Sequence, residues 1–339
     1  MYKDTIVSVI MAAYNSEPFI GEAVDSIIKQ SLPEFELIII NDNSSDNTLK
    51  IIESYNDPRI KVVSNETNRG PSYSRNKAIR LSKGKYIAIM DSDDVSISDR
   101  LEKQVSFLNK NKNIMAVGSF IEEIDQDGKK LAYVKSPIKN EQIKSSILFR
   151  IPMIHSSTMI RRDFFEENNL FYNESFSCAQ DYEMMCRLVF IADVYNIPEP
   201  LVLYRWSDNQ ISTKKKNLQD QYVKKIQSEI ISKLNIKVTD EIITIHSKFT
   251  TLDKFDTGKD KVENILKWAT LLYKKNKEEK IFDNKAFASE LLLRFLRFCK
   301  FNDISFFKTL IYQIRLHINM NKFYFPYLLI FKRRVRRYS

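Results

Sequence analysis

The chain has 339 residues, of which 43% are hydrophobic, enough for one large domain or two ordinary ones. Its three scattered cysteines exclude a disulfide framework and favour a reducing cytoplasm, and no apolar run reaches the ~20 residues that a membrane-spanning helix requires. The net charge of +10 is uneven: residues 1–213 hold 25 basic and 30 acidic side chains, whereas residues 214–339 hold 28 and 13, which indicates two modules with different partners.

Strands and helices alternate over the first hundred residues. Near-continuous apolar runs, typical of strands buried on both faces, predict strands over residues 5–13, 35–40, 59–63 and 86–90. Helical periodicity predicts helices that begin at Ser16 and after a cap at Asp46, and a third over residues 71–81. Repeated units of this kind imply a mostly parallel sheet with helices on both faces.

Polar residues follow each of these four strands. They are Tyr14-Asn15, Asn41-Asp42-Asn43, Asn68-Arg69-Gly70 and Asp91-Ser92-Asp93-Asp94. Ligands bind parallel sheets beyond the carboxyl ends of the strands, so we expect these side chains to share one ligand-binding edge.

The pattern changes after about residue 114. The turn signal Asp127-Gly128 predicts a hairpin of residues 114–124 and 129–135. Further elements are expected as a helix over 140–149, an extended segment over 156–160, a helix over 180–191 and a strand over 201–206. Beyond Lys214 the periodicity is helical throughout, with helices expected over 218–234, 239–249, 259–275, 284–301 and 305–318. We therefore expect an α/β region over 1–213 and a basic all-helical region over 214–339.

The apolar run of residues 87–90 ends in three carboxylates, Asp91, Asp93 and Asp94. A polar loop that caps the next helix would explain one of them but not three. Mg²⁺ and Mn²⁺ prefer oxygen ligands and usually sit between carboxylates and substrate phosphates. We expect Asp93 to be a metal ligand, Asp91 to contact a ribose or bridge through water, and Asp94 to hold the loop.

Three other strand-end side chains suit a nucleotide. Asp42 forms either an Asx-turn or an acceptor for a base N–H. Tyr14 can stack on a base, and Arg69 can reach a base carbonyl or a phosphate.

The later part of the region adds candidates for catalysis. Asp181 opens a predicted helix, so it is either a capping carboxylate or a general base for an acceptor hydroxyl. His155 is either structural, a further metal ligand or an acceptor contact. Arg205 and Trp206 end the last predicted strand, where they could close over the donor or face the acceptor.

These motifs resemble the inverting family 2 glycosyltransferases with the GT-A fold. The matching pieces span residues 7–212 and read VSVIMAAYN, FELIIINDNSSDNT, NRGPSYSRNKAI, GKYIAIMDSDD, HSSTMIRR, AQDYEMMCRL and YRWSDNQIS. The resemblance implies a GT-A, Rossmann-like mixed sheet with a donor half of about 1–95 and an acceptor half of about 96–213. It also implies transfer of a sugar from a UDP-sugar with inversion to a β-glycoside.

The resemblance also implies site residues. The residues that look like donor-nucleotide contacts are Ala13, Tyr14, Asn15, Asp42, Arg69, Arg75, Asp91 and Ser92. Asp91 and Asp93 look like the Asp-x-Asp that binds the diphosphate through Mn²⁺ or Mg²⁺, and Asp181 looks like the catalytic base. Two positions depart from the family pattern. Gln180 stands where an acidic residue is frequent, and Ser207 stands where a histidine often helps the metal.

Residues 323–339 combine aromatic and aliphatic side chains with five arginines and lysines. This pattern suits a membrane interface, with basic groups on anionic lipid. The alternatives are a solvated basic end or a surface for a partner protein. We expect a peripheral protein on the inner face of the cytoplasmic membrane that acts on a lipid-linked saccharide in bacterial capsule, O-antigen or lipooligosaccharide synthesis.

Two other function classes match the sequence less well. A nucleotidyltransferase of similar fold would favour a loop with glycine and lysine after the first strand, and AAYNSEPF has neither. The pI of about 9.2 suggests a nucleic-acid-binding protein, but the acidic strand ends oppose it and no recognition motif is present. We therefore expect no nucleic-acid partner.

Overall fold

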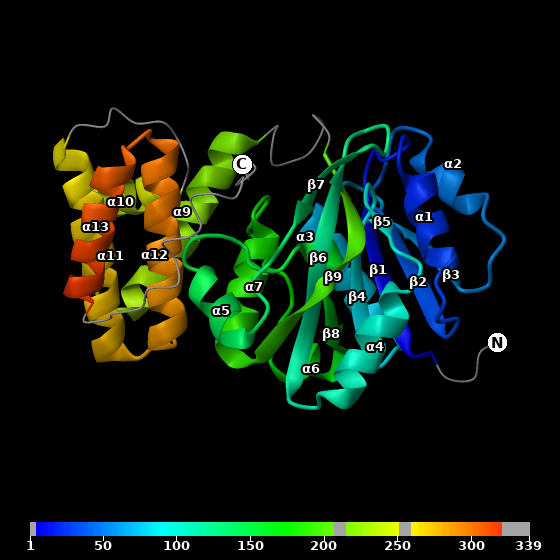
Figure 1. The fold of residues 1–339 in the computed structure, drawn as a ribbon. Helices are drawn as coiled ribbons and strands as arrows, with labels where there is room; N and C mark the ends of the chain where they lie inside the picture. Colours follow the sequence, from blue (N-terminus) through cyan, green and yellow to red (C-terminus); the bar gives the residue numbers. More distant parts are fainter. Residues whose placement is uncertain (1–4, 207–214, 251–258, 321–339) are drawn as a thin grey trace. The chain divides into compact units, whose positions relative to one another are not determined.

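The computed structural model of the chain describes residues 5–206, 215–250 and 259–320 (Figure 1). The chain divides into two compact units. The first comprises Met1–Ile143 and Ile151–Val223, and the second comprises Lys144–Arg150 and Lys224–Ser339. The predicted boundary near residue 213 lies outside the described residues, and the division of the structure falls inside helix α9 (Lys216–Lys233).

The first unit is built on a parallel sheet of four strands, as the apolar runs predict. They pair in the order β3-β2-β1-β4. Their bounds are β1 (Val7–Ala13), β2 (Phe35–Asn41), β3 (Ile60–Ser64) and β4 (Tyr86–Asp91). The chain adds β2 and β3 on one side of β1 and then returns to place β4 on the other. The β1–β4 junction is therefore the topological switch point, where open α/β sheets bind ligands.

The sheet continues beyond β4 with antiparallel and parallel strands, so it is mixed. Its full order is β3-β2-β1-β4-β8-β6-β9-β5, and β7 pairs with β6. The added strands are β5 (Val95–Ser96), β6 (Ile114–Ile124), β7 (Lys130–Val134), β8 (Met159–Arg161) and β9 (Asp193–Arg205). The pairing of β6 with β7 is antiparallel, which confirms the predicted hairpin.

Helices cover both faces of the sheet (Figure 1). Apolar side chains of α1 (Ile20–Ile28), α2 (Thr48–Glu53) and α4 (Arg100–Lys110) join one core with alternate residues of β1, β2 and β4. Burial of this apolar surface is the main stabilising contribution of the unit. The remaining helices of the unit are α3 (Pro71–Leu81), α5 (Asn140–Ser146), α6 (Arg162–Glu167) and α7 (Gln180–Ile191).

Several predicted boundaries differ from the structure; the helix expected over 140–149, for example, ends at Ser146. The helix expected at Ser16 begins at Ile20, because the Ser16 carbonyl first accepts hydrogen bonds from the N–H groups of Phe19 and Ile20 in a turn. The segment expected to be extended over 156–160 starts as a 3₁₀ turn, His155–Ser157, and only then becomes β8. The strand expected over 201–206 begins earlier, at Asp193.

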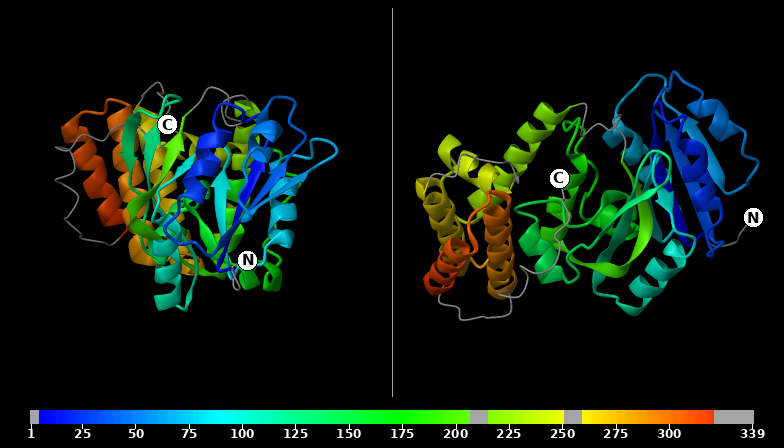
Figure 2. Two further views of the ribbon diagram at one scale, coloured as in Figure 1. Left: turned by 90° about the vertical axis from the view of Figure 1, so that its right-hand side faces the viewer. Right: turned by 45° about the horizontal axis from the view of Figure 1, so that its top comes forward.

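The second unit is helical, as the periodicity predicts. Besides the end of α9 it contains α10 (Asp240–Thr250), α11 (Lys259–Glu279), α12 (Asn284–Phe301) and α13 (Phe306–Asn319). Helices α11, α12 and α13 pack against one another (Figure 2). The Asp283 carboxylate caps α12 by accepting hydrogen bonds from the N–H groups of Lys285 and Ala286.

A neutral histidine lies in the core of the second unit. His246 is fully buried, its Nε2 lies 3.1 Å from the Leu148 carbonyl, and the Trp268 indole N–H donates to its Nδ1 at 3.3 Å. Both contacts fit one neutral tautomer, because Nε2 carries the proton and Nδ1 accepts. Burial lowers the pKa of His246 from 6.5 to about 4.

We expect this histidine to make the stability of the second unit pH-dependent. The folded pKa lies below the unfolded one, so the stabilisation is complete above pH 6.5 and is lost as pH falls towards 4. The loss is roughly 3 kcal/mol. Urea unfolding in a Trp206→Phe background measures it, because Trp268 is then the one tryptophan left in the chain. His246→Gln should remove this part of the pH dependence, and a parallel decline of both proteins would contradict the assignment.

Candidate active site

The carboxyl ends of β1, β2 and β4 lie level with one another. Ala12 pairs with Asp91 across β1 and β4, and Ala13 pairs with Asn41 across β1 and β2. β2 and β4 are two strand spacings apart, about 10 Å. The predicted strand-end residues therefore share one edge of the sheet in two groups, one beyond β2 and one beyond β4.

The group beyond β2 is organised by Asp42, which is 3% exposed. One carboxylate oxygen accepts hydrogen bonds from the Asn65 side chain at 2.7 Å and the Arg69 N–H at 2.9 Å, and the other accepts from the Gly70 N–H at 2.7 Å. Gly70 has a φ of 84°, which favours glycine. Asp42 therefore fixes the loop that carries Arg69, whose exposed guanidinium stacks on Tyr73.

Tyr14, Asn15 and Ser92 lie beside β1. Ala13 is buried at the end of β1, whereas Tyr14 is 51% exposed. Asn15 adopts a left-handed conformation with a φ of 48°, and its side chain accepts a hydrogen bond from the Ser45 N–H at 2.9 Å. The Ser92 and Ser16 hydroxyls are hydrogen-bonded at 2.8 Å, which ties the loop after β4 to the loop after β1.

The group beyond β4 is centred on Asp91. The Arg75 guanidinium donates to Asp91 Oδ1 at 2.7 Å, and His155 Nδ1 lies 3.2 Å from Oδ2. His155 is buried, and its Nε2 lies 2.8 Å from the Tyr172 hydroxyl. Burial alone would raise the pKa of Asp91, but His155 and Arg75 hold it well below its ordinary value. Asp91 is therefore a permanently ionised carboxylate held on both sides.

Arg75 has hydrogen-bond donors that no described residue uses. It is 9% exposed, and its Nε and Nη1 are buried without a hydrogen-bond partner among the described residues. Burial opposes the charge, yet Asp91, Tyr172 and Asp181 raise the pKa of Arg75 above its ordinary value. A fixed cation with two unpaired N–H groups suits an anionic ligand such as a phosphate.

Asp93 and Asp94 are the two carboxylates of this cluster whose ionised form is destabilised by burial and by neighbouring negative charge. Burial and the charge of Asp91 raise the pKa of Asp93 to about 6, and burial with the charges of Asp93 and Asp91 raises the pKa of Asp94 well above its ordinary value. Among the described residues no other side chain donates a hydrogen bond to the Asp93 carboxylate, and the hydrogen bonds that Asp94 accepts only partly offset the rise of its pKa. A bound cation would relieve this repulsion, so the residues fit a divalent metal.

A divalent metal at Asp93 would need further ligands besides the described side chains. In the described part of the chain no group of three or more His, Cys, Asp or Glu side chains is arranged to hold a metal ion. His155 uses both ring nitrogens on Asp91 and Tyr172. Mg²⁺ commonly takes only one or two protein carboxylates and completes its shell with phosphates and water. Asp93 with a diphosphate therefore matches the donor set better than a site made of protein groups alone.

Arg205 is 1% exposed and bonds to protein groups on every side. Its guanidinium donates to the carbonyls of Asp93, Asp125 and Gln126 and to the Glu22 carboxylate, and its N–H donates to Asp94 Oδ1 at 2.8 Å. It therefore positions the carboxylate loop from the interior of the unit. Trp206 is half-buried, continues the β6–β9 ladder through its N–H, and contacts Tyr204 edge to face.

Asp181 lies in the first turn of α7 and is partly exposed. Its Oδ1 accepts a hydrogen bond from the Tyr182 N–H, and its charge acts on both Arg75 and Tyr172. The neighbouring Gln180 is buried, and its Oε1 has no partner among the described residues. The structure therefore brings Asp181 close to the group beyond β4. Ser207 and residues 323–339 lie outside the described residues.

Two tyrosines of this site were not predicted. The Tyr172 hydroxyl lies 2.8 Å from His155 Nε2, and burial raises the pKa of Tyr172 well above its ordinary value, so the hydroxyl stays protonated. Tyr204 on β9 senses the charges of all four site aspartates, which raise its pKa further after burial. The period of β9 could have indicated Tyr204, since its side chain lies on the opposite face from Arg205 and packs against the cluster of Ile121, Val134 and Val202. No local signal marks Tyr172.

Comparisons with known proteins show which family the chain belongs to. The sequence model of the family described as Glycosyl transferase family 2 matches residues 8–168. A Haemophilus influenzae protein described as an uncharacterized glycosyltransferase is 36% identical over 255 residues, which are 71% of this chain and 78% of that protein. An Escherichia coli protein, UDP-Glc:alpha-D-GlcNAc-diphosphoundecaprenol beta-1,3-glucosyltransferase WfgD, is 38% identical over 117 residues, 34% of this chain and 46% of that protein.

Solved structures share the fold. S. aureus TarS 1-349 in complex with UDP-GlcNAc has a TM-score of 0.59 at 18% identity and covers 88% of this chain and 90% of its own. The mannosyltransferase PcManGT from Pyrobaculum calidifontis, in complex with GDP-Man and Mn²⁺, has a TM-score of 0.53 at 16% identity and covers 94% and 88%.

The mixed sheet with its helices and the helical region after it are the architecture of a glycosyltransferase of the GT-A class, which confirms the predicted fold. Within that class, the chain belongs to glycosyltransferase family 2. Its relatives include proteins described for bacterial polysaccharide synthesis, such as the putative teichuronic acid biosynthesis glycosyltransferase TuaG of Bacillus subtilis, which is 32% identical over 219 residues. No described helix is both long and apolar enough to cross a membrane.

The contacts of Asp42 lead to a stability prediction. Asp42→Ala leaves three N–H donors without their acceptor, so we expect it to lower the free energy of unfolding by about 2 kcal/mol or more. Urea unfolding and hydrogen exchange at the Arg69 and Gly70 amides measure the effect. Asp163→Ala, a largely exposed aspartate, is the matched control and should change stability by less than about 0.5 kcal/mol. Equal losses would show that Asp42 does not fix the loop.

Proposed function

We propose that this protein transfers a sugar from a UDP-sugar to a saccharide acceptor, with inversion to a β-glycoside. The observation that carries the proposal is the ionised Asp91, held by Arg75 beside the underpaired Asp93, at the β1–β4 switch point. In the proposed donor site the base lies between Tyr14 and the loop fixed by Asp42, and Arg69 reaches the base or a phosphate. The diphosphate lies about two strand spacings away, near Arg75 and Asp93.

The donor half of this reaction rests on Arg75 and the aspartates. The two unpaired N–H groups of Arg75 donate to diphosphate oxygens, while Asp91 keeps its guanidinium in place. Asp93, with Asp91 beside it, is the proposed metal ligand, and Ser92 lies between them. When bound, Mn²⁺ or Mg²⁺ would neutralise charge on the departing diphosphate.

The acceptor half rests on Asp181. Its carboxylate takes the proton of the acceptor hydroxyl, and the hydroxyl oxygen attacks the anomeric carbon from the face opposite UDP. One bond to carbon forms as the bond to the diphosphate breaks, so an α-linked donor gives a β-linked product. Gln180, with its buried unpaired oxygen, and the Tyr204–Trp206 pair line the proposed acceptor side.

The proposed acceptor is a saccharide on a lipid diphosphate at the inner face of the cytoplasmic membrane. WfgD, whose name states a diphosphoundecaprenol-linked acceptor and a β-1,3 linkage, supports this chemistry. Residues 323–339, with their aromatic and basic side chains, are proposed to touch anionic lipid. Residues 1–95 and 96–213 are proposed as the donor and acceptor halves.

The donor class is tested by thermal shift with UDP, GDP, CMP and TDP, each with and without Mn²⁺. A nucleotide that binds only the folded protein raises the melting temperature with the logarithm of its concentration over Kd. We expect a metal-dependent shift with UDP alone. A shift with GDP instead would overturn the UDP assignment, and no shift with any nucleotide would oppose the donor site.

Asp181→Asn is expected to lower the rate of sugar transfer by roughly 10²–10⁴ while UDP binding persists, because the amide cannot take a proton. The measurement pairs a UDP-release assay with the thermal shift. Asp163→Asn, on the surface, should change neither. Loss of UDP binding in Asp181→Asn would show that the residue is structural.

Asp93→Ala is expected to weaken UDP binding at least roughly tenfold in Mn²⁺ and to leave metal-free binding unchanged. Calorimetric titration with and without the metal separates the two. Metal-dependent affinity equal to that of the wild type would remove Asp93 from the ligand set.

A further inference from the structure

Helix α13 exposes an apolar stripe in the second unit. Ile311, Ile314 and Ile318 are 57%, 50% and 55% exposed, and with Arg315 they recur at the spacing of one helix face. Of the nine exposed large hydrophobic side chains among the described residues, three belong to this stripe and a fourth, Leu271, lies on α11. Scattered exposed hydrophobic residues need no explanation, but a stripe of this kind marks an interaction surface.

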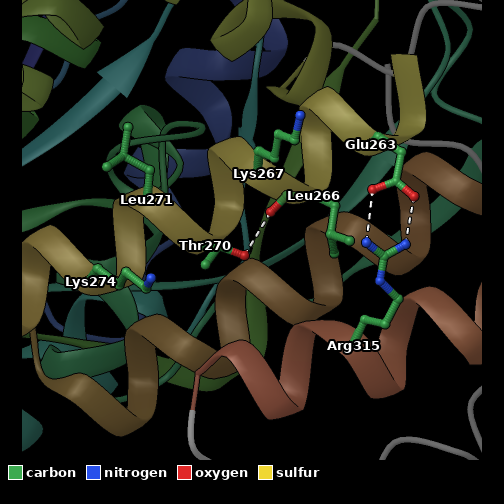
Figure 3. A pocket seen from close by; sticks show the side chains of 7 residues that line it. All are labelled: Glu263, Leu266, Lys267, Thr270, Leu271, Lys274 and Arg315. Carbon is green, nitrogen blue, oxygen red and sulfur yellow. Dashed lines mark hydrogen bonds and ion pairs between the residues drawn. The ribbon is translucent and has the colours of Figure 1, made fainter. Parts of the chain in front are cut away.

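The stripe lies beside α11. The Arg315 guanidinium bonds to both oxygens of the Glu263 carboxylate, which anchors α13 to α11. Between the two helices is a hollow of about 280 Å³ with Leu266 in its lining (Figure 3). The anchor neutralises the one carboxylate that lines this hollow.

The rim of this surface is basic. Lys267 and Lys274 line the hollow at helical spacing from Leu271, and neither forms an ion pair with any described residue (Figure 3). Lys275, by contrast, is paired with Glu278. We name Lys267, Leu271, Lys274, Ile311, Ile314 and Ile318 the α11–α13 face. Isoleucines together with lysines that no described carboxylate pairs match an anionic bilayer, whose headgroups attract the lysines while its acyl region takes up the apolar stripe.

The chain continues from this face into a segment of like chemistry. Helix α13 ends at Asn319, and residues 321–339 carry six lysines and arginines and no aspartate or glutamate. Both segments therefore favour the same negatively charged partner. A second copy of the chain is a poorer match, since a two-fold contact of this face with itself would bring the lysines of both copies into one interface.

We propose that the α11–α13 face docks on an anionic lipid bilayer. This inference rests on the proposed function, in which the acceptor is lipid-linked, and extends the membrane contact from residues 323–339 to the folded helices of the second unit. The face would hold the enzyme at the surface from which a lipid-linked acceptor is presented, and so raise the local concentration of acceptor.

Vesicle flotation of the full chain tests the proposal. We expect the wild-type protein to bind vesicles of phosphatidylglycerol and phosphatidylcholine, and the triple variant Ile311→Gln, Ile314→Gln, Ile318→Gln to bind roughly tenfold less or weaker still. The matched control makes the same change at exposed hydrophobic residues off the face, Leu131, Ile191 and Leu218, and should bind as the wild type does. Equal binding by the triple variant and the wild type would overturn the proposal.

A second variant tests the contribution of the lysine charges to vesicle binding. Lys267→Glu with Lys274→Glu should lower binding to phosphatidylglycerol vesicles and leave any weak binding to pure phosphatidylcholine unchanged. If only deletion of 323–339 lowers binding, the face is not a docking surface. If light scattering shows a dimer that the isoleucine variant dissociates, and no protein floats, the face is an interface between copies instead.

The nucleotide thermal shift separates this inference from the proposed function. All these variants should keep the UDP shift, because the substitutions lie in the second unit and, for the control, outside the residues assigned to the donor site. Vesicle binding without any nucleotide shift would support the face and count against the donor site. A UDP shift without vesicle binding would do the reverse.

Discussion

Three carboxylates at the end of a fully buried strand are the constraint around which the catalytic unit is arranged. Like charges in a poorly solvated site repel one another, so the protein must supply cations and donors for them. Asp91 is held by Arg75 and His155, and the loop of Asp93 and Asp94 is held from below by Arg205. Arg100 is also fully buried; burial lowers its pKa to about 10, and the charges of Asp94 and Asp91 partly offset that shift. The three arginines come from α3, α4 and β9, so the packing of those elements and the geometry of the site depend on each other.

The sequence predicted the parallel part of the sheet well because its physical signal is local. A strand buried on both faces must be apolar throughout, and its end is marked by the first polar residue. Helices α3, α7 and α12 were predicted with the bounds that the structure shows. The rule that strand ends share an edge then brought Asp42 and Asp91 to the same side of the sheet without any knowledge of contacts.

The contacts across the antiparallel part of the sheet could not be predicted from the sequence. His155 meets Asp91 over 64 positions, and Arg205 meets Asp93 over 112, through the pairings of β4 with β8 and of β6 with β9. Nothing local specifies those pairings. The arginine in YRW was therefore interpreted as a residue facing a substrate, whereas the structure shows it in the interior, bonded to three segments.

Hydrogen bonding distinguishes residues that stabilise the site from residues that are available to bind a ligand. Asp42 and Arg205 use their capacity on protein groups, and a buried group that is fully paired has little to give a ligand. Arg75 keeps two buried N–H groups unpaired, and Asp93 keeps a carboxylate whose pKa is raised by its neighbours. Leaving such groups underpaired costs stability, and a fold retains that cost where a ligand will complete the pairing. The cation, the carboxylate and the charges between them match a diphosphate with its metal, which is why the destabilised end of β4, and not the well-paired end of β2, is the centre of the proposed chemistry.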